Sequence, residues 1–486
     1  MSLKRYQNFV DGRYLANASG EYFEVINPAS GAVIYEVEVA DEAVQTAAIA
    51  SAQKGFALWS AMSGVERGRI LLRAVALLRE RNDILAAIEV ADTGKPWQEA
   101  SVVDVVTGAD SIEFFAGLAA AIEGNQQQLG ADFYYSRREP LGVCAGIGAW
   151  NYPLQIACWK AAPALACGNS MIFKPSEETP LGALKLAEIF IEAGMPAGVF
   201  NVVQGDGRVG AWLSQAPEVA KISFTGEVGT GKKVMRAAAE TLKGVTMELG
   251  GKSPLIIFDD ADLEEAVSAA MVANFYTQGE VCTNGTRVYV QQGIYPAFMA
   301  RLLARTRDNI RIGDPMDPAT NFGALISREH QRKVLSYYEL ARQEGGVAVA
   351  GGGIPEMPQE LRAGSWIEPT VWTGLSHDSR VAREEIFGPC CAVIPFDTEA
   401  EVVAMANDTR YGLAASVYTS NIDKAHRVAS QLRVGVVWVN SWFVRDLRTP
   451  FGGSGASGIG REGGVHSVEF YTELSNVCVK FKGSSD

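Results

Sequence analysis

Short apolar runs alternate with helical segments from about residue 140 onward, and this alternation constrains the fold more than any other feature of the sequence. Four such runs, each followed by a helix-like segment, occupy residues 142–148, 170–175, 198–205 and 220–226. Apolar runs of this length, bounded by glycine or proline, are typical of buried strands. Strands that alternate with helices form βαβ crossovers and a parallel sheet, with ligands at the carboxyl ends of the strands.

The same alternation recurs between residues 253 and 442, which predicts a second α/β domain. Ahead of the first sheet, residues 40–125 place apolar residues at helical spacing, and the second long helix of this region ends at a Thr-Gly stop. Residues 132–142 and 476–483 alternate polar and apolar side chains and are expected to pair as an arm outside both domains. No repeat or long linker separates these parts, so we expect one unit of enzyme size.

The charge of the chain argues against polyanionic partners. Forty-three basic and 56 acidic side chains give a formal net charge of −13, which repels nucleic acid and anionic membranes. No window reaches the ~18–20 consecutive apolar residues of a membrane span, and the first residues lack the apolar core of a secretory signal. We therefore expect a soluble, cytoplasmic protein that acts on a small molecule, with no nucleic-acid or membrane partner.

Cysteine and histidine usage bears on redox state and on metals. The seven cysteines form no C-x-x-C pair, which favours reduced thiols in a reducing compartment. The four histidines are scattered, without the spacing of metal ligands. No metal site is predicted.

Two glycine-rich segments suggest nucleotide binding. Residues 205–210 (GDGRVG) fit G-x-G-x-x-G, but the acidic residue that should follow about 20 residues later is missing. Residues 226–233 (GEVGTGKK) nearly fit a P-loop, yet Lys233 stands where a hydroxyl would hold Mg²⁺, which argues against a kinase or ATPase. What remains is a strand that runs into a glycine turn at a helix N-terminus, a place suited to a pyrophosphate.

Cys282 is the candidate nucleophile, because it lies between Gly279 and Gly285 in a polar turn rather than on an apolar face. A cysteine taken alone is more often a small buried hydrophobic residue. Two other residues support the functional interpretation: Glu248 lies between apolar neighbours and a Gly-Gly turn, and the amide of Asn151 is able to donate to an oxyanion.

Six motifs in a fixed order resemble those of NAD(P)-dependent aldehyde dehydrogenases. They are WNYP (150–153), FKPSE (173–177), FTGEVGTG (224–231), MELGGKSP (247–254), QGEVCTNGTR (278–287) and EEIFGP (384–389). The resemblance covers nearly the whole chain. Within the family, the first 430 residues are most similar to betaine aldehyde dehydrogenases.

The resemblance implies an α/β fold with two Rossmann-like parallel-sheet domains and a small β oligomerisation arm. Residues 1–124 and 145–247 would form the NAD-binding domain and residues 248–440 the catalytic domain. Residues 125–144 and 465–486 would form the arm, and paired arms imply a homodimer or homotetramer.

The resemblance also implies a mechanism. The Cys282 thiolate adds to the aldehyde carbon, and Asn151 with a backbone N–H at Cys282 holds the thiohemiacetal oxyanion. After hydride transfer, Glu248 activates water to hydrolyse the thioester, and the same carboxylate is suited to help deprotonate the thiol. The product is a carboxylic acid.

The cofactor expected from the resemblance is NAD, with NADP as the alternative. Glu177 matches a contact to the adenosine ribose, where a carboxylate suits two hydroxyls and not a 2′-phosphate. Lys174 matches a ribose contact as well and is grouped with the catalytic residues. The remaining expected cofactor contacts are Trp150, Ser176, Gly207, Gly226, Gly231, Glu385 and Phe387.

For the aldehyde, the resemblance to betaine aldehyde dehydrogenases implies an aromatic cage. Tyr152 and Trp159 match aromatic positions of the substrate tunnel, and Trp442 and Tyr276 are expected to add to it. Such rings hold a trimethylammonium group by cation–π attraction of about 0.5–2 kcal/mol per ring. The alternative for Trp159 is an ordinary core residue.

Residues 440–453 (NSWFVRDLRTPFGG) instead resemble 2-hydroxymuconic and 2-aminomuconic semialdehyde dehydrogenases, in which an arginine of this segment binds the substrate carboxylate. Arg445 or Arg448 would attract an acid and repel a quaternary ammonium. The second arginine of those enzymes is absent, and Glu113 in its place, at a tunnel entrance, would suit a cation. We therefore predict betaine aldehyde or a related ω-ammonium aldehyde, with a carboxylated semialdehyde as the alternative.

A catalytically silent relative with a structural or binding role is the non-enzyme alternative. Such a protein would be expected to have lost the thiol, the carboxylate or the amide. This chain keeps all three, at Cys282, Glu248 and Asn151.

Overall fold

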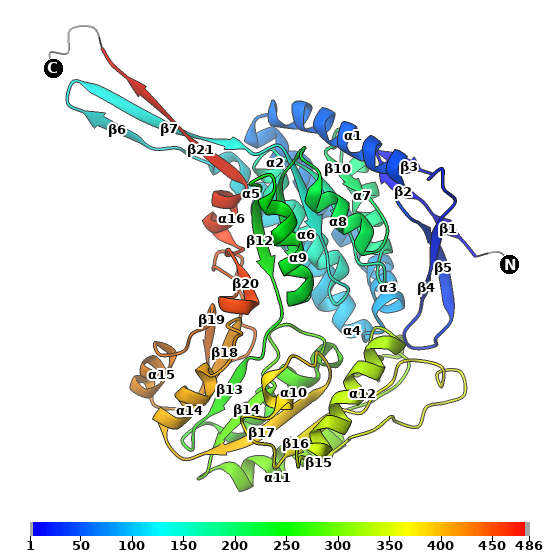
Figure 1. Cartoon of the computed structure of the whole chain (residues 1–486), viewed down its shortest axis with the longest axis vertical. Coiled ribbons are helices and arrows are strands. Elements are labelled where there is room, and N and C mark those ends of the chain that lie inside the picture. Colours follow the sequence, from blue (N-terminus) through cyan, green and yellow to red (C-terminus); the bar gives the residue numbers. More distant parts are fainter. Residues whose placement is uncertain (1–2, 482–486) are drawn as a thin grey trace.

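Two β-sheets organise the two lobes of the protein in the computed structural model, which describes residues 3–481. A three-stranded arm projects from the first lobe, as Figure 1 shows. The sheets hold strands far apart in the sequence, so the order of the strands decides which loops meet.

The first sheet has eight strands, and its five central strands are parallel. In spatial order the strands are β20 (Gly458–Ile459), β12 (Gly244–Glu248), β11 (Val219–Thr225), β8 (Val143–Ile147), β9 (Ser170–Lys174), β10 (Phe200–Val202), β2 (Asn8–Val10) and β3 (Arg13–Leu15). The four predicted runs became β8, β9, β10 and β11, and all four are buried almost throughout. A parallel sheet covered on both faces requires such continuous apolar strands.

The second sheet has seven strands, all parallel except at the β15 edge. In spatial order the strands are β15 (Val347–Ala350), β16 (Thr370–Thr373), β17 (Cys390–Phe396), β14 (Arg287–Gln291), β13 (Pro254–Ile257), β18 (Ala414–Tyr418) and β19 (Val436–Val439). The predicted second α/β unit is therefore present. A smaller sheet near the N-terminus joins β1 (Arg5–Tyr6), β5 (Val33–Glu38) and β4 (Tyr22–Ile26).

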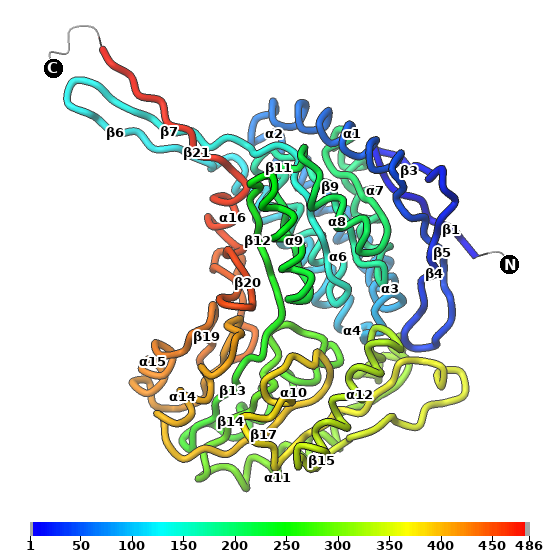
Figure 2. Tube along the Cα trace, viewed as in Figure 1, coloured from blue at the N-terminus to red at the C-terminus, as the bar shows by residue number. Residues whose placement is uncertain are grey.

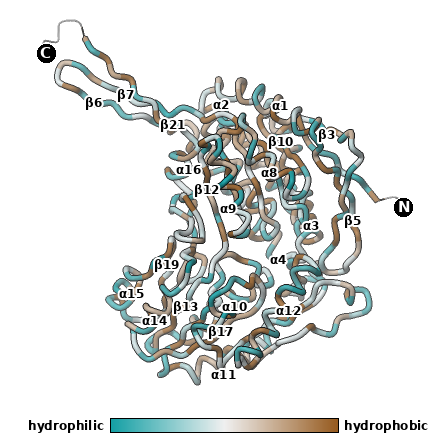
Figure 3. Tube along the Cα trace, viewed as in Figure 1, coloured by the Kyte–Doolittle hydropathy of each residue, from teal (hydrophilic) through white to brown (hydrophobic). Residues whose placement is uncertain are grey.

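Helices cover both large sheets. Those of the first lobe are α1 (Glu42–Ser60), α2 (Gly64–Glu80), α3 (Asn82–Thr93), α4 (Trp97–Glu99), η1 (Ala100–Asp104), α5 (Val105–Leu118), η2 (Ala119–Ala121), α6 (Pro153–Ala166), α7 (Leu181–Glu192), α8 (Gly207–Gln215), α9 (Val228–Ala239) and α16 (Gly464–Phe470). Those of the second lobe and its borders are α10 (Leu263–Phe275), η3 (Tyr276–Gly279), α11 (Tyr295–Asn309), α12 (Arg328–Gln343), α13 (Arg380–Arg383), α14 (Glu399–Asn407), α15 (Ile422–Ala429) and η4 (Gly455–Ser457). Figure 3 shows apolar segments concentrated in the interiors of the lobes.

Two details differ from the sequence prediction. The long helical pattern before residue 94 is broken at Arg81, whose backbone (φ −100°, ψ 15°) leaves the helical region, so it forms α2 and α3; the predicted stop is present, with Gly94 left-handed at φ 75°. The C-terminal segment also returns to the first sheet, where β20 pairs antiparallel with β12. Figure 2 shows this segment running beside β12 toward the arm.

The arm joins β21 (Thr472–Val479), β7 (Asp132–Pro140) and β6 (Gln126–Leu129) in antiparallel order. The two alternating segments picked out in the sequence therefore pair. The last five residues of the predicted arm, 482–486, lie outside the described residues. Within residues 3–481, no helix is long and apolar enough to cross a membrane.

Candidate active site

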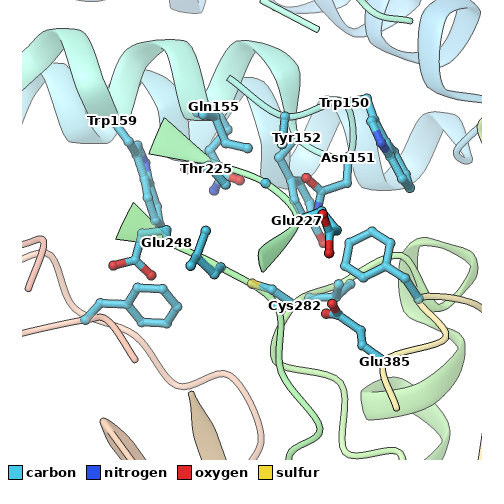
Figure 4. A pocket seen from close by; sticks show the side chains of 18 of the residues that line it. Trp150, Asn151, Tyr152, Gln155, Trp159, Thr225, Glu227, Glu248, Cys282 and Glu385 are labelled. Atoms are coloured by element: carbon cyan, nitrogen blue, oxygen red, sulfur yellow. The ribbon is translucent and has the colours of Figure 1, made fainter. Parts of the chain in front are cut away.

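Side chains at the carboxyl ends of three neighbouring strands of the first sheet lie close together, because parallel strands all end on the same side of a sheet. Asn151 follows β8, Glu227 follows β11 and Glu248 ends β12. Cys282 comes from the other lobe, in the loop before β14. All four line one cavity between the lobes (Figure 4).

Cys282 lies on a loop with an unusual backbone. Thr277, Gln278 and Gly279 are all left-handed, with φ of 47°, 50° and 73°. Non-glycine residues in this conformation are strained and persist only where neighbouring structure holds them. Glu99 does so here, since it accepts hydrogen bonds from the backbone N–H and the hydroxyl of Thr277. The loop therefore presents the thiol in a fixed orientation.

Burial raises the pKa of the Cys282 thiol to about 12, and the carboxylates of Glu248 and Glu385 add to this effect while Arg445 opposes it. The other six cysteines are free and do not line this cavity. Because the thiolate is the nucleophile, Cys282 needs a base or a favourable charge in the cavity to react.

Asn151 is buried and its side-chain Nδ2 donates to the carbonyl of Glu280 at 2.9 Å. An amide nitrogen carries two hydrogens. One holds the side chain in place, and the second remains for an oxygen in the cavity.

Glu248 is a buried carboxylate, 8% exposed, and neither of its oxygens has a hydrogen-bond partner. Burial raises its pKa well above the usual value, and the nearby Glu462 raises it further, while Lys160, Arg445 and Arg461 lower it. An unpartnered buried carboxylate is costly and often marks a functional group. A carboxylate with a raised pKa is suited to act as a general base.

A second groove adjoins this cavity along the ends of β8, β9 and β11. It is lined by five of the residues expected to contact the cofactor: Lys174, Ser176, Glu177, Gly207 and Gly226. The Lys174 amine lies 3.3 Å from a Glu177 carboxylate oxygen. A side chain at Gly207 would meet no atom within 4 Å, so its backbone is open to a ligand.

The cavity and the groove share five lining residues: Ala149, Trp150, Thr225, Gly226 and Glu227. Gly231, also expected to contact the cofactor, does not line the groove. It packs against Leu249, and a Cβ there would lie 2.7 Å from the leucine Cδ2.

Glu385 and Phe387 reach the cavity from the second lobe. Glu385 accepts a hydrogen bond from the Gly251 N–H at 2.9 Å, and burial raises its pKa to about 7. Phe387 is left-handed at φ 63°, and its ring contacts Trp150 edge-on with centroids 5.2 Å apart.

The aromatic wall differs from the predicted cage. The aromatic residues that line the cavity are Trp150, Tyr152, Trp159, Phe387, Phe443 and Phe451. Tyr276 instead borders a separate cavity, and Trp442 donates its indole N–H to the Thr283 carbonyl. Trp442 stacks on Phe443, so Phe443 takes the lining position predicted for Trp442.

Arg445 is the arginine that faces the cavity. Its guanidinium carbon lies 3.5 Å from the ring centroid of Trp159 and 3.8 Å from that of Phe451. Arg448 points away: it is exposed and pairs with Asp446. The guanidinium of Arg445 therefore covers one face of each of these two rings.

Glu113 does not lie at the tunnel entrance where the sequence predicts it. It does not line the cavity but forms an exposed ion pair with Arg79 on α2. Glu462 does line the cavity, together with Glu227, Glu248 and Glu385, and its carboxylate lies 3.5 Å from the Lys160 amine.

A buried lysine behind the site was missed by the sequence prediction. Lys95 is fully buried, pairs with Asp104 and donates to the backbone carbonyl of Asn151 at 2.7 Å. Its amine also lies 4.1 Å from the ring centroid of Tyr152. No sequence signal marks this lysine, because charged residues are usually exposed. It fixes the backbone that carries both Asn151 and Tyr152.

Replacing Lys95 by methionine is expected to destabilise the protein by about 3–5 kcal/mol, because the change leaves Asp104 as an unpaired buried carboxylate. It should also lower kcat/KM, since the Asn151 carbonyl loses its donor. Urea unfolding and steady-state kinetics measure both effects. Lys54→Met, an exposed lysine on α1, is the control, and equal stability of the two variants would contradict the assigned role.

The parallel sheets, the groove at their strand ends and the adjoining cavity with its thiol, amide and carboxylate fit an α/β oxidoreductase. The chain belongs to the aldehyde dehydrogenase family, whose model matches residues 14–477. The family membership and fold class predicted from the six motifs are thereby confirmed.

Individual relatives are similar over nearly their full length. The chain is 57% identical over 474 residues to a betaine aldehyde dehydrogenase of Vibrio vulnificus (strain YJ016), with 97% of each covered. A putative aldehyde dehydrogenase from Burkholderia cenocepacia superimposes with a TM-score of 0.97 at 39% identity, covering 99% of this chain and 98% of that chain. The NAD+ complex of an aldehyde dehydrogenase from Bacillus cereus gives a TM-score of 0.95 at 38% identity, with 99% and 97% covered.

Proposed function

We propose that this protein oxidises an aldehyde to a carboxylic acid with NAD+, using Cys282 as the nucleophile. The observation that carries the proposal is that the thiol of Cys282, the amide of Asn151 and the carboxylate of Glu248 line one cavity, which joins the groove of Lys174 and Glu177. A reacting carbonyl in this cavity meets a nucleophile, an oxyanion donor and a base.

In the proposed mechanism the Cys282 thiolate adds to the aldehyde carbon, and the free Asn151 N–H donates to the oxygen that becomes negative. The thiohemiacetal carbon loses a hydride to the acceptor that the adjoining groove would hold, and this leaves a thioester on Cys282. Glu248 then accepts a proton from water as that water attacks the thioester. The acid is released and the thiol is restored.

The groove fits a dinucleotide by its residues. The N-terminus of α9 and the open backbone at Gly207 suit phosphates, and Glu177 suits the hydroxyls of a ribose rather than a 2′-phosphate. When bound there, NAD+ supplies the hydride acceptor. The NAD+ complex of the Bacillus cereus relative supports the same choice.

For the substrate we propose betaine aldehyde, oxidised to glycine betaine. The name of the Vibrio vulnificus relative, 57% identical, supports this substrate. Tyr152 and Phe443 offer aromatic surface in the cavity for a trimethylammonium group.

Arg445 favours a second candidate, a carboxylated aldehyde such as 2-hydroxymuconic semialdehyde. Its guanidinium covers the face of Trp159 and lies in the same cavity as Cys282. A guanidinium in such a place binds carboxylate and opposes a quaternary ammonium. With Glu113 turned away to Arg79, the predicted carboxylate at the tunnel entrance no longer favours a cation.

The test is NADH formation, as kcat/KM, for betaine aldehyde, an aminoaldehyde and 2-hydroxymuconic semialdehyde under identical conditions. The proposal predicts preference for the cationic aldehydes, and preference for the acid would replace it with the second candidate. Arg445→Met is expected to raise kcat/KM for betaine aldehyde and to lower that for the acid, each by roughly tenfold or more, as one charged contact is worth about 1.5–3 kcal/mol. Arg448→Met removes the same charge outside the cavity and should change neither.

We also propose that the arm mediates assembly into a homodimer or homotetramer and that the protein acts in the cytoplasm. Exposed apolar side chains on the arm, including Leu129 and Leu474, support the first point. Seven free cysteines are compatible with a reducing compartment. Sedimentation of the purified protein distinguishes dimer from tetramer.

A further inference from the structure

Glu227 is an acidic residue at a position where a dinucleotide needs the opposite charge. It is the one charged residue among the five that line both the catalytic cavity and the adjoining groove. Lys174 and Glu177 line only the groove, and Cys282 lines only the cavity, so the five shared residues form the junction between them. A dinucleotide that spans from one to the other must place its middle, the diphosphate, at this junction.

The Glu227 carboxylate already caps the N-terminus of α9, which is the part of the groove that would bind the diphosphate. Glu227 is the N-cap of α9, and one of its oxygens accepts a hydrogen bond from the Thr230 N–H at 3.1 Å. The carboxylate lies over Gly229, where a Cβ would be 2.7 Å from its oxygen. Unpaired N–H groups at a helix N-terminus attract phosphate for the same reason that they attract a carboxylate.

From this geometry we propose that Glu227 is an internal competitor of the cofactor diphosphate. Binding requires the carboxylate to leave the α9 N-terminus, and the exposed position of Glu227 allows it to do so. The competition lowers affinity for the dinucleotide and speeds its release. This inference rests on the proposed use of NAD and identifies a residue that sets its affinity.

The test is calorimetric binding of NAD+, ADP and adenosine to the intact enzyme and its variants. Glu227→Gln should tighten NAD+ and ADP by roughly three- to tenfold, the size of a charge effect at a helix terminus, and should leave adenosine unchanged because adenosine has no phosphate. Glu227→Asp keeps the charge and the cap and should bind like the wild type. Glu240→Gln removes the same charge at the far end of α9 and should have no effect.

The possible results separate the two proposals. Wild-type affinity of Glu227→Gln for NAD+ would overturn the competitor role and leave the proposed function intact. Equal gains for adenosine and ADP, or equal gains in Glu240→Gln, would overturn it as well, since the effect would then not act on the diphosphate. Failure of every variant to bind NAD+ would overturn the proposed function and this inference together.

Discussion

Replacement of Cys282 by alanine is expected to abolish aldehyde oxidation, with kcat/KM falling by on the order of 10⁴-fold or more, as for other nucleophile deletions. The thiol of Cys282 is the one cysteine sulfur that lines the cavity shared with Asn151 and Glu248. The hydroxyls that line the cavity are those of Tyr152 and Thr225, and burial raises the pKa of Tyr152, so neither is an activated nucleophile. Steady-state NADH formation measures the loss.

Binding of NAD+ should be unaffected in this variant, since the groove residues Lys174, Glu177 and Gly207 lie outside the catalytic cavity. Unchanged affinity in calorimetry therefore separates loss of chemistry from loss of fold. Cys478→Ala, an exposed cysteine on the arm, is the matched control and should retain full activity. Persistent oxidation by Cys282→Ala would show that the nucleophile is another group.

Much of the candidate site can be predicted from the sequence, because parallel strands all end on the same side of a sheet. β8, β11 and β12 are neighbouring parallel strands, so the residues at their carboxyl ends meet at one edge of the sheet. Asn151, after β8, and Glu248, at the end of β12, are two of these residues. The motif resemblance adds Cys282, which no strand rule places, because it enters from the second lobe through an irregular loop.

The residues that the sequence leaves open depend on side-chain direction in segments without regular structure. Residues 440–453 contain no strand or helix, so periodicity does not tell which of Trp442, Phe443, Arg445 and Arg448 points inward. The structure turns Phe443 and Arg445 toward the cavity, with Phe443 left-handed at φ 68°.

The pairing of charged residues is another property that the sequence of this chain does not predict. The sequence predicts Glu113 at a tunnel entrance and gives no sign of Lys95, yet Glu113 pairs with Arg79 on the surface and Lys95 with Asp104 in the interior. Both partners are more than eight residues away along the chain, so no local pattern indicates them. The charge of a pocket therefore has to be taken from the structure.

The Glu248→Gln variant is expected to carry out the first half of the reaction and stall at the thioester. The glutamine cannot accept a proton from water, so kcat should fall by about 10²–10⁴-fold, the usual contribution of a general base. Rapid mixing should still show a burst of NADH that approaches one equivalent per active site. A burst is expected because the thiol, Asn151 and the groove are unchanged.

The pH dependence of the burst sharpens this prediction. The Glu248 carboxylate raises the pKa of the Cys282 thiol, so its removal lowers that pKa, and the burst should reach its full rate at lower pH than in the wild type. The slow step should lose the increase with pH that ionisation of Glu248 gives the wild type, whose carboxyl is neutral at low pH because burial raises its pKa. Normal steady-state turnover by Glu248→Gln would contradict the assigned role. Loss of the burst along with turnover would instead mean that Glu248 is needed to deprotonate the thiol, so the burst amplitude decides at which of the two steps this carboxylate acts.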